Sequence, residues 1–312
     1  MAKIGVLFPG QGSQYVGMGK KLYDRFDTVR ELFAKADSTL GFPISELFFQ
    51  GPEEELRQTF NTQPALLLAC YATWRVLTQE ISFAPFILAG HSLGEYTALL
   101  ASGYFSFEDA LRITRKRGLL MEESCPKGKG GMAALIGADM EKVEPVLRET
   151  SHDDYVVVPA NLNSADQVVL SGDLGALREC VEKLKGIGYK KAVFLNVSGP
   201  FHSPLMKEGA GKLRTELESL TKGEMIYPVV CNVDASPEQN KERVADKLFR
   251  QMFSPVRWEE SVKRMAREGV ELFIEVGPQK VLTNLVRRIQ PGIPCYNVEG
   301  MEEIEGLKAI LA

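Results

Sequence analysis

The chain has 312 residues, of which 45% are hydrophobic and 25% charged, a composition typical of a globular protein with one large domain or two smaller ones. A formal net charge of −4 argues against a nucleic-acid-binding protein, and no apolar run is long enough to span a bilayer. The 5 cysteines lack the spacing of a metal site, so we expect reduced thiols, no bound metal and a cytoplasmic location.

A glycine-rich turn follows the first predicted strand. Residues 3–8 form an apolar run typical of a buried strand, with no signal-peptide pattern before it. The sequence PGQGSQ at 9–14 comes next, but it is not a dinucleotide-binding fingerprint because Tyr15 stands where the third glycine should be. The turn is therefore either a plain strand-to-helix connection or a loop that brings backbone donors near a site.

Three helices are predicted before the next strand. Asp27 is the expected N-cap of a helix that reaches residue 40, and Pro52 opens another with acids in its first turn. A longer apolar helix is expected over 65–78, followed by a buried strand at 86–89. Strands that alternate with helices predict a mostly parallel sheet covered on both faces.

The segment GHSLG at 90–94 fits the pattern G-x-S-x-G between that strand and a helix predicted over 93–101. Its glycines permit a turn too tight for a β-carbon, which would lift Ser92 to the tip. The backbone N–H of Leu93 could then donate to a developing oxyanion. Five such residues also occur by chance, and the motif alone does not separate a hydrolase from a transferase.

A helix predicted from residue 106 or 107 to 124 carries a cation on its apolar stripe. Arg117 falls at the same helical spacing as the stripe residues Ala110, Ile113, Thr114, Leu120 and Met121. A buried guanidinium must be paired, so it either forms a structural ion pair or receives a substrate carboxylate. The helical spacing does not decide between the two.

Residues 130–197 follow the pattern β-α-β-β-α-β of a ferredoxin-like unit. We expect this small domain to be inserted into the larger one, with a polar turn after its second strand. The predicted elements are a strand at 132–137, a helix at 140–150, strands at 155–161 and 167–171, a helix at 174–187 and a strand at 190–195.

His202 is the best candidate for a general base. It lies in a loop with one glycine and two prolines, whereas His152 sits in a polar segment and His91 should point away from its neighbour Ser92. The alternative is a loop histidine that fixes a turn. The remaining predicted helices span 205–220 and 241–252, and a third follows Pro278 and ends near residue 289. Strands are predicted at 229–231 and 271–275, with an edge strand at 295–298.

Five spaced motifs resemble those of malonyl-CoA:acyl carrier protein transacylases. They are FPGQGSQ at 8–14, GHSLGEY at 90–96, Arg117, GPFH at 199–202 and QMFSPVRW at 251–258. The resemblance runs from about residue 4 to 290 and implies an α/β fold, with a hydrolase-like core of mostly parallel sheet and an inserted ferredoxin-like α+β small domain. The core would comprise residues 1–129 and 198–312, and the insert residues 130–197.

The resemblance also implies roles for individual residues. Ser92 would be the nucleophile and His202 the general base and then acid, oriented by the main-chain carbonyl of Gln251. The backbone N–H groups of Gln11 and Leu93 would form the oxyanion hole.

Four further residues would bind substrate. Arg117 would hold the malonyl carboxylate, and the bulky ring of Phe201 would favour malonyl over branched acyl groups. Asn161 and Asn163 would line the pantetheine channel. The sequence has Met252, Phe253 and Ser254 where many members of that family have Leu-Tyr-Asn, which is a mild departure from the family pattern.

The implied reaction is ping-pong transfer of malonyl from malonyl-CoA to holo acyl carrier protein through a malonyl-serine, by a monomer without a cofactor. Two other classes remain open, a thioesterase-like hydrolase and a non-enzymatic carrier-protein docking module. An acidic carrier protein would need a local basic patch on this acidic chain, and the candidates are Lys127, Lys129, Lys190, Lys191, Arg287 and Arg288.

Overall fold

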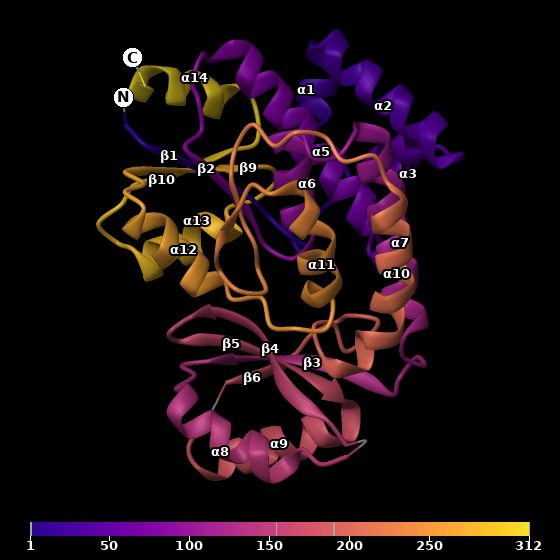
Figure 1. Ribbon diagram of the computed structural model, residues 1–312, viewed down its shortest axis with the longest axis vertical. Helices are drawn as coiled ribbons and strands as arrows, with labels where there is room; N and C mark the ends of the chain where they lie inside the picture. The colour runs from indigo at the N-terminus through magenta and orange to yellow at the C-terminus, as the bar shows by residue number, and fades with distance from the viewer. Residues whose placement is uncertain (1, 154, 190, 312) are drawn as a thin grey trace.

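The structure is a computed structural model that describes residues 2–153, 155–189 and 191–311. The chain has an α/β fold with two sheets, one in each of two bodies stacked along the vertical axis of Figure 1. Both ends of the chain contribute to the upper body, where the two termini lie close together, and a middle segment forms the lower body. No helix within the described ranges combines the length and hydropathy that crossing a lipid bilayer requires.

The larger sheet has the strand order β10-β9-β1-β2-β7-β8. Neighbouring strands run parallel, except that β8 pairs antiparallel with β7. The central strands are buried along their whole length, as expected of apolar runs covered on both faces. The strands are β1 (Ile4–Phe8), β2 (Ile87–Gly90), β7 (Val229–Val230), β8 (Pro237–Glu238), β9 (Leu272–Val276) and β10 (Cys295–Val298).

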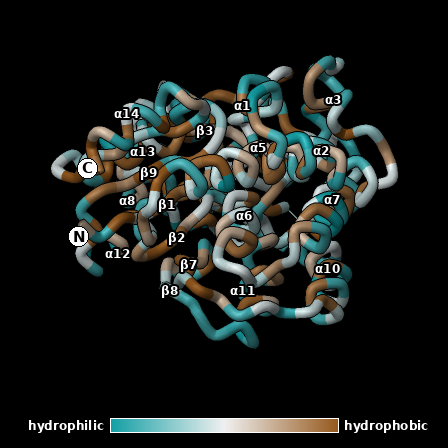
Figure 2. The backbone as a smooth tube through the Cα atoms, turned by 90° about the horizontal axis from the view of Figure 1, so that it is seen from above, coloured by the Kyte–Doolittle hydropathy of each residue, from teal (hydrophilic) through white to brown (hydrophobic). Residues whose placement is uncertain are grey.

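Helices cover both faces of this sheet. Val6 and Phe8 of β1 belong to the same core as α5 and α6, whereas Leu7 packs in a second core with α12 and α13. In Figure 2 the hydrophobic strands β1 and β2 lie between these two groups of helices. The helices of the upper body are α1 (Lys20–Arg25), α2 (Asp27–Leu40), α3 (Ile44–Gln50), α4 (Glu53–Leu56), α5 (Thr59–Glu80), α6 (Leu93–Ser102), α7 (Phe107–Glu123), α10 (Lys207–Ser219, after a 3₁₀ turn at Pro204–Met206), α11 (Lys241–Gln251), α12 (Trp258–Arg267), α13 (Val281–Ile289) and α14 (Met301–Leu311).

The smaller sheet is antiparallel, with the order β4-β5-β3-β6. Ala133 and Leu135 of β3 pack in a separate core with α8 and α9, whereas Met132 and Ala134 join the core of the upper body. One face of this sheet therefore borders the larger body. The elements are β3 (Gly130–Ile136), α8 (Met140–Thr150), β4 (Val157–Ser164), β5 (Gln167–Asp173), α9 (Leu174–Gly186) and β6 (Ala192–Phe194).

Strand β4 extends beyond the predicted range of 155–161. Asn161 forms a parallel bridge with Val256 of the upper body. The amide of Leu162 donates to the Val256 carbonyl at 2.9 Å, and the amide of Val256 donates to the Ala160 carbonyl at 2.8 Å. Residues 162–164 of the expected polar turn are therefore strand, paired with β5 and bonded at Leu162 to Val256, and the turn is confined to residues 165–166.

Helix α5 begins at Thr59, earlier than the predicted range of 65–78, and contains Pro64. The missing N–H of this proline leaves the carbonyl of Phe60 without its helical donor. That carbonyl instead lies 3.5 Å from Nη1 of Arg115. The predicted start at residue 65 was wrong because a contact with α7 compensates for the lost bond, so the helix begins before the proline.

Candidate active site

Ser92 lies in the sharp turn between β2 and α6. Its backbone has φ 52° and ψ −103°, a strained combination for a residue with a side chain. A Cβ on Gly90 would lie 1.9 Å from the backbone of Gly94, and one on Gly94 would lie 2.0 Å from the carbonyl oxygen of Phe8. Both positions therefore require glycine, and this close packing holds Ser92 at the edge of a cavity.

His202 contacts the serine although 110 residues separate the two in the chain. Its Nε2 lies 2.7 Å from Oγ of Ser92, and its Nδ1 lies 2.8 Å from the main-chain carbonyl oxygen of Gln251. A carbonyl can only accept, so Nδ1 carries the proton and Nε2 is free to accept from the serine hydroxyl. The loop therefore presents the tautomer that a general base requires.

Burial also keeps this imidazole neutral. His202 has 3% of its surface exposed. Burial, together with the nearby Arg117 cation, lowers its pKa to about 3, against the opposing effect of the hydrogen bond to Gln251. A neutral imidazole is the form that can take a proton at physiological pH.

Arg117 is buried beside Ser92, with 1% of its surface exposed. Its Nη1 donates to Oε1 of Gln63 at 2.8 Å, and its Nη2 donates to Oε1 of Gln251 at 3.0 Å and to Oγ of Ser92 at 3.1 Å. The guanidinium also lies over the ring of Tyr96, with Cζ 5.2 Å from the centroid. Every one of these partners is neutral.

No described residue offers this guanidinium a carboxylate within salt-bridge distance, and its Nε has no hydrogen-bond partner in the described part of the chain. A cation desolvated without a counter-charge is costly. The structural ion pair that the sequence allowed is therefore absent among the described residues, and the guanidinium is available to an anionic ligand.

The sequence did not predict a polar network behind the serine. The side chain of Gln251 donates through Nε2 to the carbonyl of Ser92 at 3.0 Å and to Oε2 of Glu95 at 2.9 Å. Oδ1 of Asn232 accepts from the amide of Ser92 at 2.7 Å, and the Asn232 amide donates to Glu95 at 2.8 Å. Burial raises the pKa of Glu95 to about 7, although these hydrogen bonds act in the opposite direction.

Two backbone amides next to the serine are candidates for oxyanion donors. Leu93 is the first residue of α6. Neither its amide N–H nor that of Gln11 donates a hydrogen bond to any residue that the structure describes. Both residues line the same cavity as Ser92. The amides of Gly94 and Glu95, by contrast, already donate to backbone carbonyls in the turn.

The cavity beside Ser92 has a volume of about 100 Å³ and is lined by Phe201 as well as by His202 and Arg117. Phe201 is buried, with 5% of its surface exposed. A cavity of about 390 Å³ adjoins it. The two share the lining residues Gln11, His91, Asn161 and Leu195.

Asn161 and Asn163 line the larger of these cavities from β4. Oδ1 of Asn163 lies 2.8 Å from Nε2 of His91, so the imidazole next to the serine bonds across to the smaller sheet. The structure thus gathers every predicted site residue around one cleft between the two sheets.

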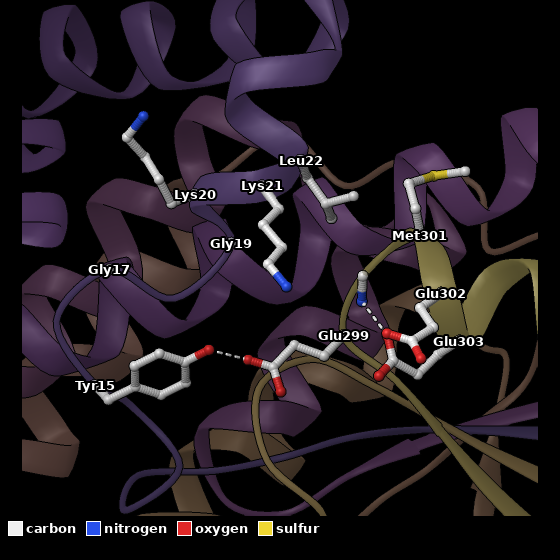
Figure 3. A pocket seen from close by; sticks show the side chains of 11 residues that line it. Tyr15, Gly17, Gly19, Lys20, Lys21, Leu22, Glu299, Met301, Glu302 and Glu303 are labelled. Atoms are coloured by element: carbon white, nitrogen blue, oxygen red, sulfur yellow. Dashed lines mark hydrogen bonds between the residues drawn. The ribbon is translucent and has the colours of Figure 1, made fainter.

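A separate cavity of about 410 Å³ lies between residues 15–22 and 299–303 (Figure 3). Here Tyr15 donates to Glu299, and the amide of Gly300 donates to Glu303 at 3.0 Å. The residues that line it include no serine, cysteine or histidine, and none of them lines the cleft at Ser92. We assign no acyl chemistry to it.

Comparison with known proteins identifies the family. A family model described as "Acyl transferase domain" matches residues 6–300. The malonyl CoA-acyl carrier protein transacylase of Bacillus subtilis is 44% identical over 305 residues, which cover 98% of this chain and 96% of that protein. An acyl carrier protein S-malonyltransferase from Vibrio cholerae has a similar structure, with a TM-score of 0.95 and 41% identity over 98% of this chain and 100% of the other.

A further solved structure contains a malonyl-transacylase in complex with its holo type II PKS acyl-carrier protein. It matches with a TM-score of 0.94 and 41% identity, over 97% of this chain and 98% of the other. With the family model and these relatives spanning nearly the whole sequence, the chain belongs to the acyl transferase family, among the malonyl-CoA:acyl carrier protein transacylases.

Proposed function

We propose that this protein transfers a malonyl group from malonyl-CoA to the phosphopantetheine thiol of a holo acyl carrier protein. The observation that carries the proposal is the placement of Arg117, a buried cation without an acid partner among the described residues, against the Ser92–His202 pair. The pair supplies a nucleophile for acyl transfer, and the cation selects an acyl group that ends in a carboxylate.

In the first half-reaction, Nε2 of His202 takes the hydroxyl proton of Ser92 while Oγ attacks the thioester carbonyl of malonyl-CoA. The N–H groups of Gln11 and Leu93 stabilise the tetrahedral oxyanion. When this intermediate collapses, the carbon–sulfur bond breaks, the imidazolium returns its proton to the CoA thiolate, and a malonyl ester remains on Ser92.

In the second half-reaction, the phosphopantetheine thiol of the carrier protein loses its proton to His202 and attacks the ester. The ester carbon–oxygen bond then breaks, and Ser92 recovers its hydroxyl proton from the imidazolium. Water competes with the thiol at this stage. The narrow cavity of about 100 Å³ around the ester favours the transfer because it leaves little room for bulk solvent.

Substrate selection would depend on the residues around this cavity. Arg117 would bind the malonyl carboxylate, since its guanidinium has unmet hydrogen-bonding capacity. The buried ring of Phe201 would crowd an acyl group with a branch at its second carbon. Asn161 and Asn163 would contact the pantetheine arm in the adjoining cavity of about 390 Å³.

The two bodies would act as domains. We assign residues 1–129 and 198–312 to a hydrolase-like catalytic domain and 130–197 to a ferredoxin-like domain inserted into it. The antiparallel order β4-β5-β3-β6 with α8 and α9 on one face supports the second assignment. The monomer would suffice for activity because both domains of one chain line the cleft.

Intact mass spectrometry after mixing with malonyl-CoA tests the function. A malonyl adduct is expected on the wild-type protein and not on Ser92→Ala, and holo acyl carrier protein should discharge the adduct. Rapid release of free malonate without carrier protein would instead favour a hydrolase, and a chain that forms no adduct would favour a docking module.

The carrier protein would dock on basic residues near the cleft. Arg288 lines the cavity of about 390 Å³, and its Nη1 lies 3.5 Å from Oε1 of Gln167 on β5. Of the other candidates, Lys190 lies outside the described residues. The remaining ones are Lys127, Lys129, Lys191 and Arg287.

A further inference from the structure

Glu95 is a fully buried acid in the first turn of α6, a helix of otherwise mostly apolar residues. Its Oε2 accepts hydrogen bonds from Nε2 of Gln251 at 2.9 Å and from the amide of Asn232 at 2.8 Å. An ionisable group is costly to bury. The transfer mechanism described above makes no use of this carboxyl group, so its place in the network needs another explanation.

We propose that Glu95 is a positioning residue that fixes the side chain of Gln251, and through it both the oxyanion donor of Leu93 and the guanidinium of Arg117. This inference rests on the proposed transfer reaction, because it assigns Glu95 a part in the geometry of that reaction. Glu95 itself would touch neither substrate nor any reacting atom.

The link to the oxyanion donor runs through one peptide unit. Nε2 of Gln251 donates to the carbonyl oxygen of Ser92 at 3.0 Å, and the same peptide carries the N–H of Leu93. In a trans peptide the C=O and N–H bonds point in opposite directions. A carbonyl anchored towards Gln251 therefore directs the N–H of Leu93 to the other side of the peptide.

The side chain of Asn232 holds the two peptide units on either side of His91. Oδ1 of Asn232 accepts from the amide of Ser92 at 2.7 Å, and its Nδ2 donates to the carbonyl of Gly90 at 2.7 Å. The main chain of Asn232 is in turn bonded to Glu95. One carboxylate thus supports both peptide units that flank the nucleophile.

The link to Arg117 depends on which way the Gln251 amide faces. Its Oε1 accepts from Nη2 of Arg117 at 3.0 Å while its Nε2 faces Glu95. Oε2 of Glu95 accepts from two N–H groups and is therefore an acceptor whether or not Oε1 carries a proton, and a guanidinium only donates. Reversing the amide would place two donors together and two acceptors together, so Glu95 and Arg117 jointly impose a single orientation.

The test compares Ser92 acylation by malonyl-CoA and by acetyl-CoA in three variants. Glu95→Ala should slow malonyl loading by about 10- to 100-fold, less than the loss expected from deleting an oxyanion donor, and should lower the preference for malonyl. Glu95→Gln retains an acceptor oxygen and should recover most of both. Thr97→Val is the matched control, because the Thr97 hydroxyl is buried on the same helix without a partner in the described chain.

Gln251→Met provides an independent readout that does not depend on Glu95→Ala folding. It keeps the main-chain carbonyl that holds His202 and removes the amide, so it should reproduce the rate and preference of Glu95→Ala. Two results would overturn the inference. One is a Gln251→Met variant with the acylation rate and malonyl preference of the wild type. The other is a Glu95→Gln variant that loads malonyl as slowly as Glu95→Ala. A wild-type protein that forms no Ser92 adduct would instead refute the proposed function.

Discussion

Arg117 is a cation withdrawn from water and surrounded by neutral partners. Its hydrogen bonds to Gln63, Gln251 and Ser92 fix its direction without neutralising its charge. A substrate carboxylate would therefore gain a charge-assisted bond that no described side chain already occupies. The energetic gain falls on malonyl and not on acetyl, which carries no second carboxyl group.

We predict that Arg117→Ala lowers kcat/KM for malonyl-CoA by about 30- to 1,000-fold, equivalent to roughly 2–4 kcal/mol for the loss of a buried charged partner. Acetyl transfer should stay unchanged or rise. Arg115→Ala is the control, because Arg115 lies on the same helix but bonds to Asn61 and does not line the cleft. Equal losses with both acyl groups would contradict the role assigned to Arg117.

His202 links the chemistry to stability. Its pKa is about 3 in the folded protein, below the value of roughly 6.5 for a free histidine. Between these values the unfolded chain binds one more proton than the folded chain at this site. The stability that neutral His202 contributes is therefore present above pH 6.5 and is lost as the pH falls towards 3.

We predict that wild-type stability falls between pH 7 and 5 more steeply than that of His202→Gln. The two slopes should differ by up to about 1.4 kcal/mol per pH unit, the contribution of a single proton. Urea unfolding at a series of pH values measures both slopes. Parallel curves would mean that His202 is not kept neutral by the fold. The same variant should also lose Ser92 acylation by about 10²- to 10⁴-fold.

Short motifs mark most of the residues that the structure gathers at the cleft, whereas the sequence offered no account of those that only the fold brings there. The turn at Ser92 was recognised because its glycines and its flanking strand and helix are local. Glu95 was missed although an acid within an apolar helix was a visible signal. Asn232 had no such signal, since a single asparagine after a short strand is common.

At the scale of elements, the turn between β2 and α6 determines the position of Ser92, the proposed nucleophile. Its closeness to β1 is measurable, since a Cβ on Gly94 would lie 2.0 Å from the Phe8 carbonyl oxygen. Neither β1 nor α6 can shift to make room without moving Ser92, because both are packed in the core.

We predict that Gly94→Ala destabilises the protein by about 4 kcal/mol or more and abolishes Ser92 acylation. The control is Gly211→Ala in α10, where an added Cβ would meet nothing within 4 Å. That variant should be more stable by about 0.5–1 kcal/mol, because alanine favours helix, and should load malonyl normally. Thermal and urea unfolding give the stabilities, and intact mass gives the loading. A stable, active Gly94→Ala would show that the turn can relax.

Most elements were predicted from local pattern, and the errors share a physical cause. The helix α8 and the edge strand β10 match their predicted ranges, since the first has a clear helical period and the second is a short apolar run. Helices α1, α3 and α14 were missed, and α5 and β4 begin or end elsewhere than predicted. In α5 and β4, contacts with Arg115 and Val256 replace hydrogen bonds that the local sequence does not supply.

At the scale of the whole molecule, the cleft exists because two sheets of different topology face each other. Backbone bonds between β4 and Val256 join them, and Asn163 reaches His91 across the same boundary. The turn that carries Ser92 comes from the larger sheet, whereas Asn161 and Asn163, which line the adjoining cavity, come from the smaller one. Neither body alone would line both cavities.

The overall charge of −4 raises a question for a protein that must attract anionic CoA and an acidic carrier protein. We propose that the local placement of basic residues matters more than the total charge. Arg288 lies at the cavity that leads to Ser92, whereas Arg287, next to it on α13, does not line that cavity. Charge near the entry of a site affects association more than the total charge of a protein does.

We predict that Arg288→Glu lowers kcat/KM for holo acyl carrier protein by about 3- to 10-fold at low salt, as expected for reversing one exposed charge at an interface. Arg287→Glu makes the same change in total charge and should have a smaller effect. Raising the ionic strength should shrink the difference between the two variants, because salt screens exposed charges. If both variants lose activity equally, the net charge of the molecule and not the position of Arg288 governs the encounter. The measurement thus distinguishes an electrostatic attraction that depends on the total charge of the protein from one that depends on the charge where the phosphopantetheine arm would enter.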